Sequence, residues 1–422
     1  MLGSFQNAFK VGDLRTKVLF TLGMFLVFRF GCHIPVPGIN PEVFTNLLDN
    51  QLFGFFDLIS GGAFKRFSIF AMSITPYINA SIIMQLLTVV IPRLEQLQKE
   101  GEEGRKKITQ YIRYGTVVLG FIQAMGMSIA MGRYPGALDK PGIASYLLIA
   151  ISLTAGTALL MWIGEIITEK GIGNGISLII FAGIVARLPA GISNIYQLAA
   201  AGTIGFWNVF SFVAIALLVI AGVVAINEGQ RRIPVQYAKR VVGRRVYGGQ
   251  STFLPLRVNM GGVIPIIFAM SVMMFPGVIS SWAPNSAAAN FINTYFNFRT
   301  VLYNALYGLL IFFFTYFYVA IIFNPADVAD NIKKYGGFIP GIRPGRPTAD
   351  YIDRVLSRLT FFGGIFLALI AILPNFVIAI TGITNAWFGG TALLIVVGVA
   401  LDTMKQIEAH LLLRSYEGFV KN

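Results

Sequence analysis

The chain has 422 residues, of which 55% are hydrophobic and 12% are charged, and its mean hydropathy is +0.70. Charged residues make up about a quarter of a soluble globular protein, so this composition excludes that class. The net charge is +14, which is typical either of a partner of polyanions or of a membrane protein with basic loops on one side. The single cysteine, Cys32, permits no intramolecular disulfide, and we predict no metal or other cofactor.

Ten apolar stretches follow one another along the chain. A helix of about 20 apolar residues crosses ~30 Å of hydrocarbon and satisfies its own backbone hydrogen bonds. We therefore predict a membrane-spanning helix in each stretch. The fifth and tenth are short, so we expect them to be tilted or flanked by helix that leaves the membrane. The stretches are Val18–Ile34, Ile69–Ile91, Tyr114–Met131, Tyr146–Ile167, Ile176–Leu188, Phe206–Ile226, Val263–Trp282, Val301–Phe323, Leu359–Ile380 and Thr391–Thr403.

Basic residues alternate between the two sides of these stretches. Of the 33 Lys and Arg, 26 lie before the first stretch, after the second, fourth, sixth and eighth, or in the C-terminal tail. Six lie on the opposite side, and Arg29 alone lies deep within a stretch. Because basic residues are retained on the cytoplasmic side, we predict that both termini are cytoplasmic.

The ten stretches divide into two halves, residues 1–190 and 191–422, at the neutral segment Pro189–Gly205. An odd number of spans in each half makes the halves enter the membrane from opposite sides, as in an inverted repeat. The prediction is an all-α polytopic membrane protein with ten transmembrane helices in two pseudo-symmetric inverted halves. No clear sequence repeat accompanies this parity, so the symmetry is a hypothesis.

The segment Phe53–Phe67, between the first two stretches, differs from its surroundings. It is moderately apolar, yet it carries Asp57 and the Gly61–Gly62 pair. Short apolar segments are more often re-entrant or interfacial than spanning. Two interpretations stay open: a short re-entrant helix buried in the bundle, or a helix lying on the outer surface.

Three loops of the basic side have different characters. Leu94–Arg113 mixes both signs of charge and is interpreted as a solvated connection. In the loop at about 227–258, Asn227–Arg257 alternates apolar and polar residues, which predicts a projecting hairpin. The loop at about 324–358 begins with a capped helical turn and continues with Gly-Pro turns that display Arg343 and Arg346. Such loops are typical of partner-docking surfaces or of anionic-lipid binders.

The apolar stretches contain few ionisable residues and no recognisable catalytic motif. Glu165 and Asp402 lie near cytoplasmic ends, which argues against ion coupling, and a secondary transporter of small solutes is the disfavoured alternative. No G-x-S-x-G or H-E-x-x-H motif indicates an enzyme. Gly171–Gly175 (GIGNG) lacks the Lys-Ser/Thr of a phosphate loop and is interpreted as a tight turn. In each of two isoleucine pairs, the members are one helical turn apart and lie on the same helix face. Packing between membrane helices alone also produces this spacing. The pairs are Ile74 and Ile78, and Ile176 and Ile180.

Several long strings of this chain resemble the SecY family, the central channel subunits of the bacterial Sec protein translocase. They run in order from the first stretch to the last: FRFGCHIPVPGI (Phe28–Ile39), SGGAFKRFSIFAMSITPYINASIIMQLL (Ser60–Leu87), KEGEEGRKKITQYIRYGT (Lys99–Thr116), GEIITEKGIGNGIS (Gly164–Ser177), GQRRIPVQYAKR (Gly229–Arg240), QSTFLPLRVNMGGVIP (Gln250–Pro265), FNPADVADNIKKYGGFIPGIRPG (Phe323–Gly345) and FGGTALLIVV (Phe388–Val397).

The resemblance implies a passive channel, with no catalytic residues, that moves unfolded secretory polypeptides across the bacterial inner membrane and releases membrane helices laterally into it. It implies a pore ring of Ile74, Ile78, Ile176, Ile180, Ile267 and Ile395, in which Ile264 and Leu394 are alternatives to the last two. It places a plug in residues 53–67, including Ile59, Ser60, Gly61, Gly62 and Phe64. Spans two and three would meet spans seven and eight in a lateral gate, with Gln85 and Asn259.

The resemblance also implies the partners of the channel. The cytosolic loops would dock the SecA ATPase or the ribosome, whose rRNA phosphates suit basic side chains. Small subunits similar to SecE and SecG would complete the complex, and signal sequences, nascent polypeptide and membrane lipids would contact the pore and its gate. The expected docking residues are Arg240, Arg244, Arg245, Arg343 and Arg346.

Overall fold

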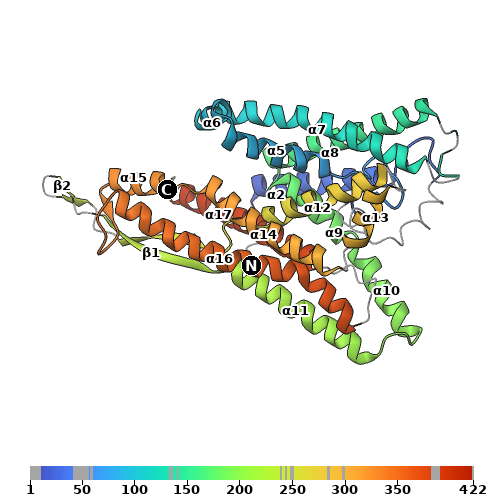
Figure 1. The fold of residues 1–422 in the computed structure, drawn as a ribbon. Coiled ribbons are helices and arrows are strands. Elements are labelled where there is room, and N and C mark those ends of the chain that lie inside the picture. The colour runs from blue at the N-terminus through green and yellow to red at the C-terminus, as the bar shows by residue number, and fades with distance from the viewer. Residues whose placement is uncertain are drawn as a thin grey trace.

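Each predicted stretch overlaps a helix in the computed structural model (Figure 1). The structure describes residues 11–40, 57, 60–132, 136–138, 140, 142–237, 240–242, 245–247, 251–282, 286–296, 300–381 and 390–420. The helices of the ten stretches are α2 (Gly12–Gly31), α5 (Thr75–Val90), α7 (Glu102–Met131), α8 (Ile143–Lys170), α9 (Gly175–Val185), α11 (Phe206–Glu228), α12 (Ile264–Trp282), α14 (Val301–Ile322), α16 (Arg346–Thr381) and α17 (Gly390–Val420).

These helices make the chain an all-α, multi-pass membrane protein. Among the described residues, six helical segments are long and apolar enough to cross a membrane. The number rises to seven if α5 and α6 (Pro92–Lys99), which are bent by 102°, form one broken span. The prediction of an all-α polytopic protein is confirmed, whereas the count of ten spans and the inverted symmetry of the halves stay predictions.

Three predicted segments have more or less helix in the structure than their sequence indicated. The second stretch is helical only from Thr75, because Ser73 adopts a positive φ of 52° and Pro76 stands in the first turn, where proline is favoured. The predicted connection Leu94–Arg113 is largely helical, in α6 and the start of α7. Most of the predicted neutral segment Pro189–Gly205 forms α10 (Leu188–Ala200), which continues the short fifth stretch as expected for a flanking helix.

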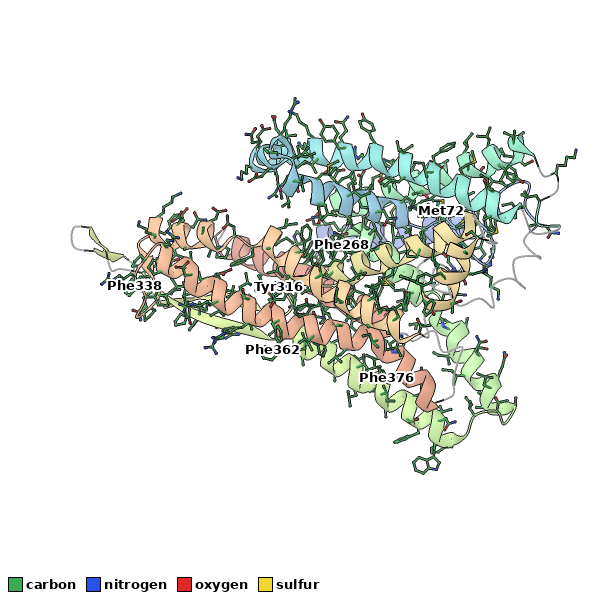
Figure 2. All side chains as sticks on the ribbon, in the orientation of Figure 1. Met72, Phe268, Tyr316, Phe338, Phe362 and Phe376 are labelled. Carbon is green, nitrogen blue, oxygen red and sulfur yellow. The ribbon has the colours of Figure 1, made fainter. Side chains whose placement is uncertain are left out.

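The helices form two groups with α12 between them (Figure 1). The first group contains α5, α7 and α8, which pack on one another, and the second contains α11, α14, α16 and α17. Helix α12 packs against α5 and α7 on one side and against α14 on the other. Phe268 of α12 is buried between the groups, whereas Phe362 and Phe376 lie exposed along α16, where lipid would cover them (Figure 2).

The predicted hairpin is present in the loop after α11. Strand β1 (Gln230–Tyr237) pairs antiparallel with β4 (Ser251–Arg257), and a smaller ladder joins β2 (Arg240–Val242) to β3 (Arg245–Tyr247). The prediction did not include β5 (Gly337–Phe338), which comes from the next basic loop and pairs with β1. The two loops therefore form one sheet at the end of the molecule that also carries α15 (Pro325–Lys334) (Figure 1).

The sheet and α15 have a small hydrophobic core of their own. It contains Ile233, Val235 and Leu256 from the hairpin and Ile332 and Ile339 from the second loop. Helix α15 begins with the predicted cap, since the Asn324 side chain accepts a hydrogen bond from the Ala326 amide. This core keeps the two loops in a fixed arrangement outside the transmembrane helices.

A close contact fixes α8 against the segment that leads into α5. A Cβ atom at Gly156 would overlap the backbone carbonyl of Ile69. We predict that Gly156→Val destabilises the protein by about 2 kcal/mol or more, since overpacking a buried site forces the backbone to move. The thermal unfolding midpoint of the purified protein should fall, whereas Gly23→Val in α2, where nothing lies within 4 Å, should leave it nearly unchanged. Equal midpoints for the two variants would contradict the contact.

Candidate functional site

The six predicted ring isoleucines come together in the largest buried cluster of the described residues. Ile74, Ile78, Ile180 and Ile395 are buried members of this cluster, and Ile176 and Ile267 pack against it as partly buried side chains. They come from α5 and its N-cap and from α9, α12 and α17. The two alternatives, Leu394 and Ile264, belong to the same cluster or pack against it, so the choice between neighbours in α12 and α17 stays open.

The turn before α9 places its isoleucines. The Asn174 side chain caps α9 by accepting a hydrogen bond from the Ser177 amide, and Gly173 adopts a positive φ of 86° that favours glycine. The Gly175 amide donates to the Thr168 hydroxyl at the end of α8. The interpretation of GIGNG as a tight turn is confirmed, and the turn sets the position of Ile176 and Ile180 relative to α8.

Most of the described part of the segment 53–67 is buried in the protein, with Lys65 and Arg66 exposed. Ser60, Gly61 and Phe64 are buried, and Ala63 belongs to the same cluster as the ring isoleucines. This burial favours the re-entrant interpretation over a helix on the outer surface. Gly62 is half-buried with a positive φ of 89°, and Ile59 lies outside the described residues.

Polar contacts tie this segment to α2 and to the junction of α9 and α10. The Asp57 carboxylate pairs with the Arg187 guanidinium at 2.5 Å and accepts a hydrogen bond from the Lys65 amide at 2.7 Å. Arg29 Nη1 donates to the Gly61 carbonyl at 2.7 Å, and the Cys32 thiol donates to the Ser60 carbonyl at 3.6 Å. Burial raises the pKa of the Asp57 carboxyl above its ordinary value, and Arg187 and the Lys65 amide oppose this rise.

Sequence reasoning did not assign Asp57, Arg29 or Arg187 to the site. The available signal was the position of Arg29, because an arginine deep in an apolar stretch needs a polar partner. Its partner is a backbone carbonyl of the plug segment, which no pairing of opposite charges indicates. Arg187 was counted only as one basic residue of the outer side.

The two predicted gate residues lie on elements that face each other. Gln85 is in α5, and Asn259 precedes α12, which packs against α5 and α7. Asn259 Nδ2 donates to Asn227 Oδ1 at 2.8 Å and to the Gly262 carbonyl at 3.1 Å, which directs that amide toward the end of α11. In the described structure, Gln85 Oε1 and Asn259 Oδ1 are buried without a hydrogen-bond partner, and buried polar atoms of this kind call for an explanation.

The predicted docking arginines lie at the end with the sheet. Arg343 is exposed in the turn before α16, and its carbonyl accepts a hydrogen bond from the Thr348 hydroxyl at 2.9 Å. Arg346 is exposed at the first position of α16. Arg240 and Arg245 begin β2 and β3, whereas Arg244 lies outside the described residues.

Comparisons with known proteins agree on one family. A family model described as SecY matches residues 68–404. The protein translocase subunit SecY of Halalkalibacterium halodurans is 53% identical over 430 residues, with 100% of both chains covered. The protein of the same description from Thermotoga maritima is 48% identical over 432 residues, covering 100% of this chain and 98% of its own.

Two solved structures share the fold. A structure described as a protein conducting channel matches with a TM-score of 0.67 at 19% identity, covering 94% of this chain and 92% of its own. A canine structure, described as Sec61 in a ribosome-channel complex from the endoplasmic reticulum, matches with a TM-score of 0.64 at 18% identity over the same shares. At these identities the two structures support the fold alone.

Proposed function

Because this chain belongs to the SecY family and is a protein-translocation channel subunit, we propose that the isoleucines of α5, α9, α12 and α17 form its constriction. The observation that carries the proposal is that isoleucines from both predicted halves meet in one buried cluster. A narrow waist of branched aliphatic side chains excludes water and therefore blocks ions. The same side chains are compliant enough to surround an unfolded polypeptide.

The plug segment would seal the resting channel next to this ring. Its Ala63 shares the ring's cluster, and Phe64 and Phe67 extend into a second buried cluster beside it. A translocating polypeptide would have to displace these residues, since they occupy the space beside the constriction.

The lateral gate would open between α5 and α7 on one side and α12 and α14 on the other. The closed contact is the packing of α12 on α5 and α7. Gln85 Oε1 in α5 and Asn259 Oδ1 before α12 are buried without a hydrogen-bond partner in the described residues. Hydration of these oxygens during opening would offset part of its cost, because a buried polar atom without a partner is unfavourable.

The cytosolic sheet and its arginines would dock the partners that supply energy. The canine relative of this fold is described in a ribosome-channel complex, and the basic loops suit rRNA phosphates. We propose the SecA ATPase as the alternative occupant of the same surface, and SecE and SecG as companion subunits. We further propose that the sheet and both termini lie in the cytoplasm, because basic loops are retained on that side, and that the chain lies in the bacterial inner membrane.

Site-specific crosslinking tests the channel path. A photoreactive residue at position 78 or 180 is expected to crosslink to a secretory precursor stalled in reconstituted vesicles, because both positions face the proposed constriction. A photoreactive residue at position 83 is the control, since Ile83 is on the same helix as Ile78 but is exposed. Precursor crosslinks at position 83 without crosslinks at 78 and 180 would place the path on another face.

The comparisons give no support to the alternative interpretation as a secondary transporter of small solutes. Within the proposed function, partners supply the energy, so the channel needs no coupling carboxylate in its path. The described intramembrane charges suit this passive role, because Arg29 binds a backbone carbonyl and Glu165 pairs with Arg113 at 2.8 Å.

A further inference from the structure

The ion pair between Asp57 and Arg187 joins two segments that are far apart in the sequence. Asp57 precedes the Gly61–Gly62 turn of the plug segment, and Arg187 is the N-cap residue of α10. The Asp57 side chain is 3% exposed and that of Arg187 is 15% exposed. Because the pair is shielded from water, loss of one partner leaves a charge that solvent stabilises poorly.

Two contacts with the backbone of Gly61 hold the plug segment at the same site. We call this site the seat and define it by Arg187, Gly183 and Arg29. A Cβ at Gly61 would lie 3.0 Å from Cα of Gly183 in α9, so the two backbones touch at this point. On the other side, Arg29 of α2 donates to the Gly61 carbonyl. The seat therefore has a charged contact at Asp57 and a close backbone contact at Gly61, each with a separate element.

The charges around the seat are mostly positive. Arg29 and Arg66 both lie within electrostatic range of Arg187, and Lys65 lies within range of Asp57. Asp57 is thus a carboxylate surrounded by several cations. Its removal leaves Arg187 and Arg29 to repel each other at partly buried positions, where charges are screened less than at the exposed Lys65 and Arg66.

We propose that Asp57 and Arg187 are positioning residues that latch the plug segment to the junction of α9 and α10. The latch rests on the proposed function, since it presumes that this segment seals the channel. The contacts named above, of Asp57 with Arg187 and of Gly61 with Gly183 and Arg29, each join residues within 1–190. Separation of α12 from α5 and α7 therefore does not by itself break the latch, and release of the plug is a distinct step in opening.

The single cysteine of the chain reports on the latch. Cys32 is fully buried, and its thiol contacts the Ser60 carbonyl of the plug segment. In vesicles that hold the intact channel complex, a membrane-impermeant maleimide added on the outer side should label wild-type Cys32 slowly. We expect Asp57→Asn and Arg187→Met each to raise the labelling rate at least tenfold. Arg187→Lys, which keeps the charge, should restore most of the protection.

Two control variants separate the latch from general effects. Lys65→Met removes one positive charge from an exposed side chain and leaves the ion pair intact, so its labelling rate should match that of wild type. The double variant Asp57→Asn/Arg187→Met removes both charges and leaves no unpaired one. It should still label at least tenfold faster than wild type, because the latch itself is absent.

A glycine pair provides an independent test of the seat. Gly61 and Gly62 both have positive φ angles, of 66° and 89°, so alanine strains the backbone at either position. Only Gly61 faces a neighbour, since nothing lies within 4 Å of a Cβ at Gly62. We expect Gly61→Ala to label Cys32 several-fold faster than Gly62→Ala does. Equal rates would overturn the assignment of Gly183 to the seat.

The outcomes distinguish the latch from the proposed function. A stalled precursor should increase labelling of wild-type Cys32, since the plug is then displaced. If the precursor has this effect but the single and double variants label like wild type, the latch is wrong and the plug stands. If the precursor leaves Cys32 protected, the segment does not move during translocation and the proposed plug role fails with the latch.

Discussion

Replacement of Ile78 or Ile180 with glycine is expected to make the resting channel leak small ions. Both side chains are buried in the cluster of the proposed ring, with exposed fractions of 8% and 2%. Removal of a branched side chain leaves a cavity in the constriction. Once water enters that cavity, the barrier that dewetting imposes on ions is lost. Ion efflux from vesicles that contain the channel should rise at least tenfold over the wild-type rate.

The matched control for this experiment is Ile83→Gly. Ile83 is on the same helix as Ile78, α5, but is 40% exposed. Glycine costs a helix about 1 kcal/mol at either position, so the two variants share the backbone effect and differ only in the site. Unchanged ion efflux in both ring variants would remove the isoleucines from the constriction, and an equal leak in Ile83→Gly would attribute the effect to a weakened helix.

The variant Arg343→Glu is expected to abolish translocation while the protein still folds and inserts. Arg343 is exposed in the turn between β5 and α16, and its backbone carbonyl accepts a hydrogen bond from the Thr348 hydroxyl. The reversed charge introduces repulsion against an anionic partner within the proposed docking surface, which slows association and weakens binding. Export of a secretory precursor and binding of the SecA ATPase should fall together.

Lys170→Glu is the appropriate comparison. Lys170 is exposed at the end of α8, so the substitution reverses the same charge on the predicted cytoplasmic side but outside the sheet and α15. We expect nearly normal export from this variant. Wild-type export by Arg343→Glu, at equal protein levels in the membrane, would exclude Arg343 from docking.

The sequence pattern predicted those elements that depend on residues close to them in the chain. The alternation in Asn227–Arg257 reflects one buried face of β1, in which Ile233 and Val235 point to the small core. The cap at Asn324 and the turn at Gly171–Gly175 also depend on neighbouring residues. For this reason each was predictable without knowledge of the rest of the fold.

Features that depend on segments far apart in the sequence, or that extend beyond the hydropathy pattern, were not predicted. Strand β5 has two residues, too few for any periodic pattern, and it forms because β1 offers a free edge. Helix α7 begins at Glu102, because the helix continues into water beyond the apolar residues that the hydropathy pattern detects. The contacts of Asp57 and Arg29 require the plug segment to return to α2 and α9, and no local pattern encodes that return.

The addition of β5 to the hairpin has a mechanical consequence. Strand β1 follows α11 almost directly, and the chain after β5 leads into α16, while α11 packs on both α16 and α17. A force applied at the docking arginines is therefore transmitted by the sheet to two transmembrane helices at once, α11 and α16. Force from a bound partner would turn α11, α14, α16 and α17 together, since these helices pack on one another, and α12, which packs on α14, would lie at the border of the moving group.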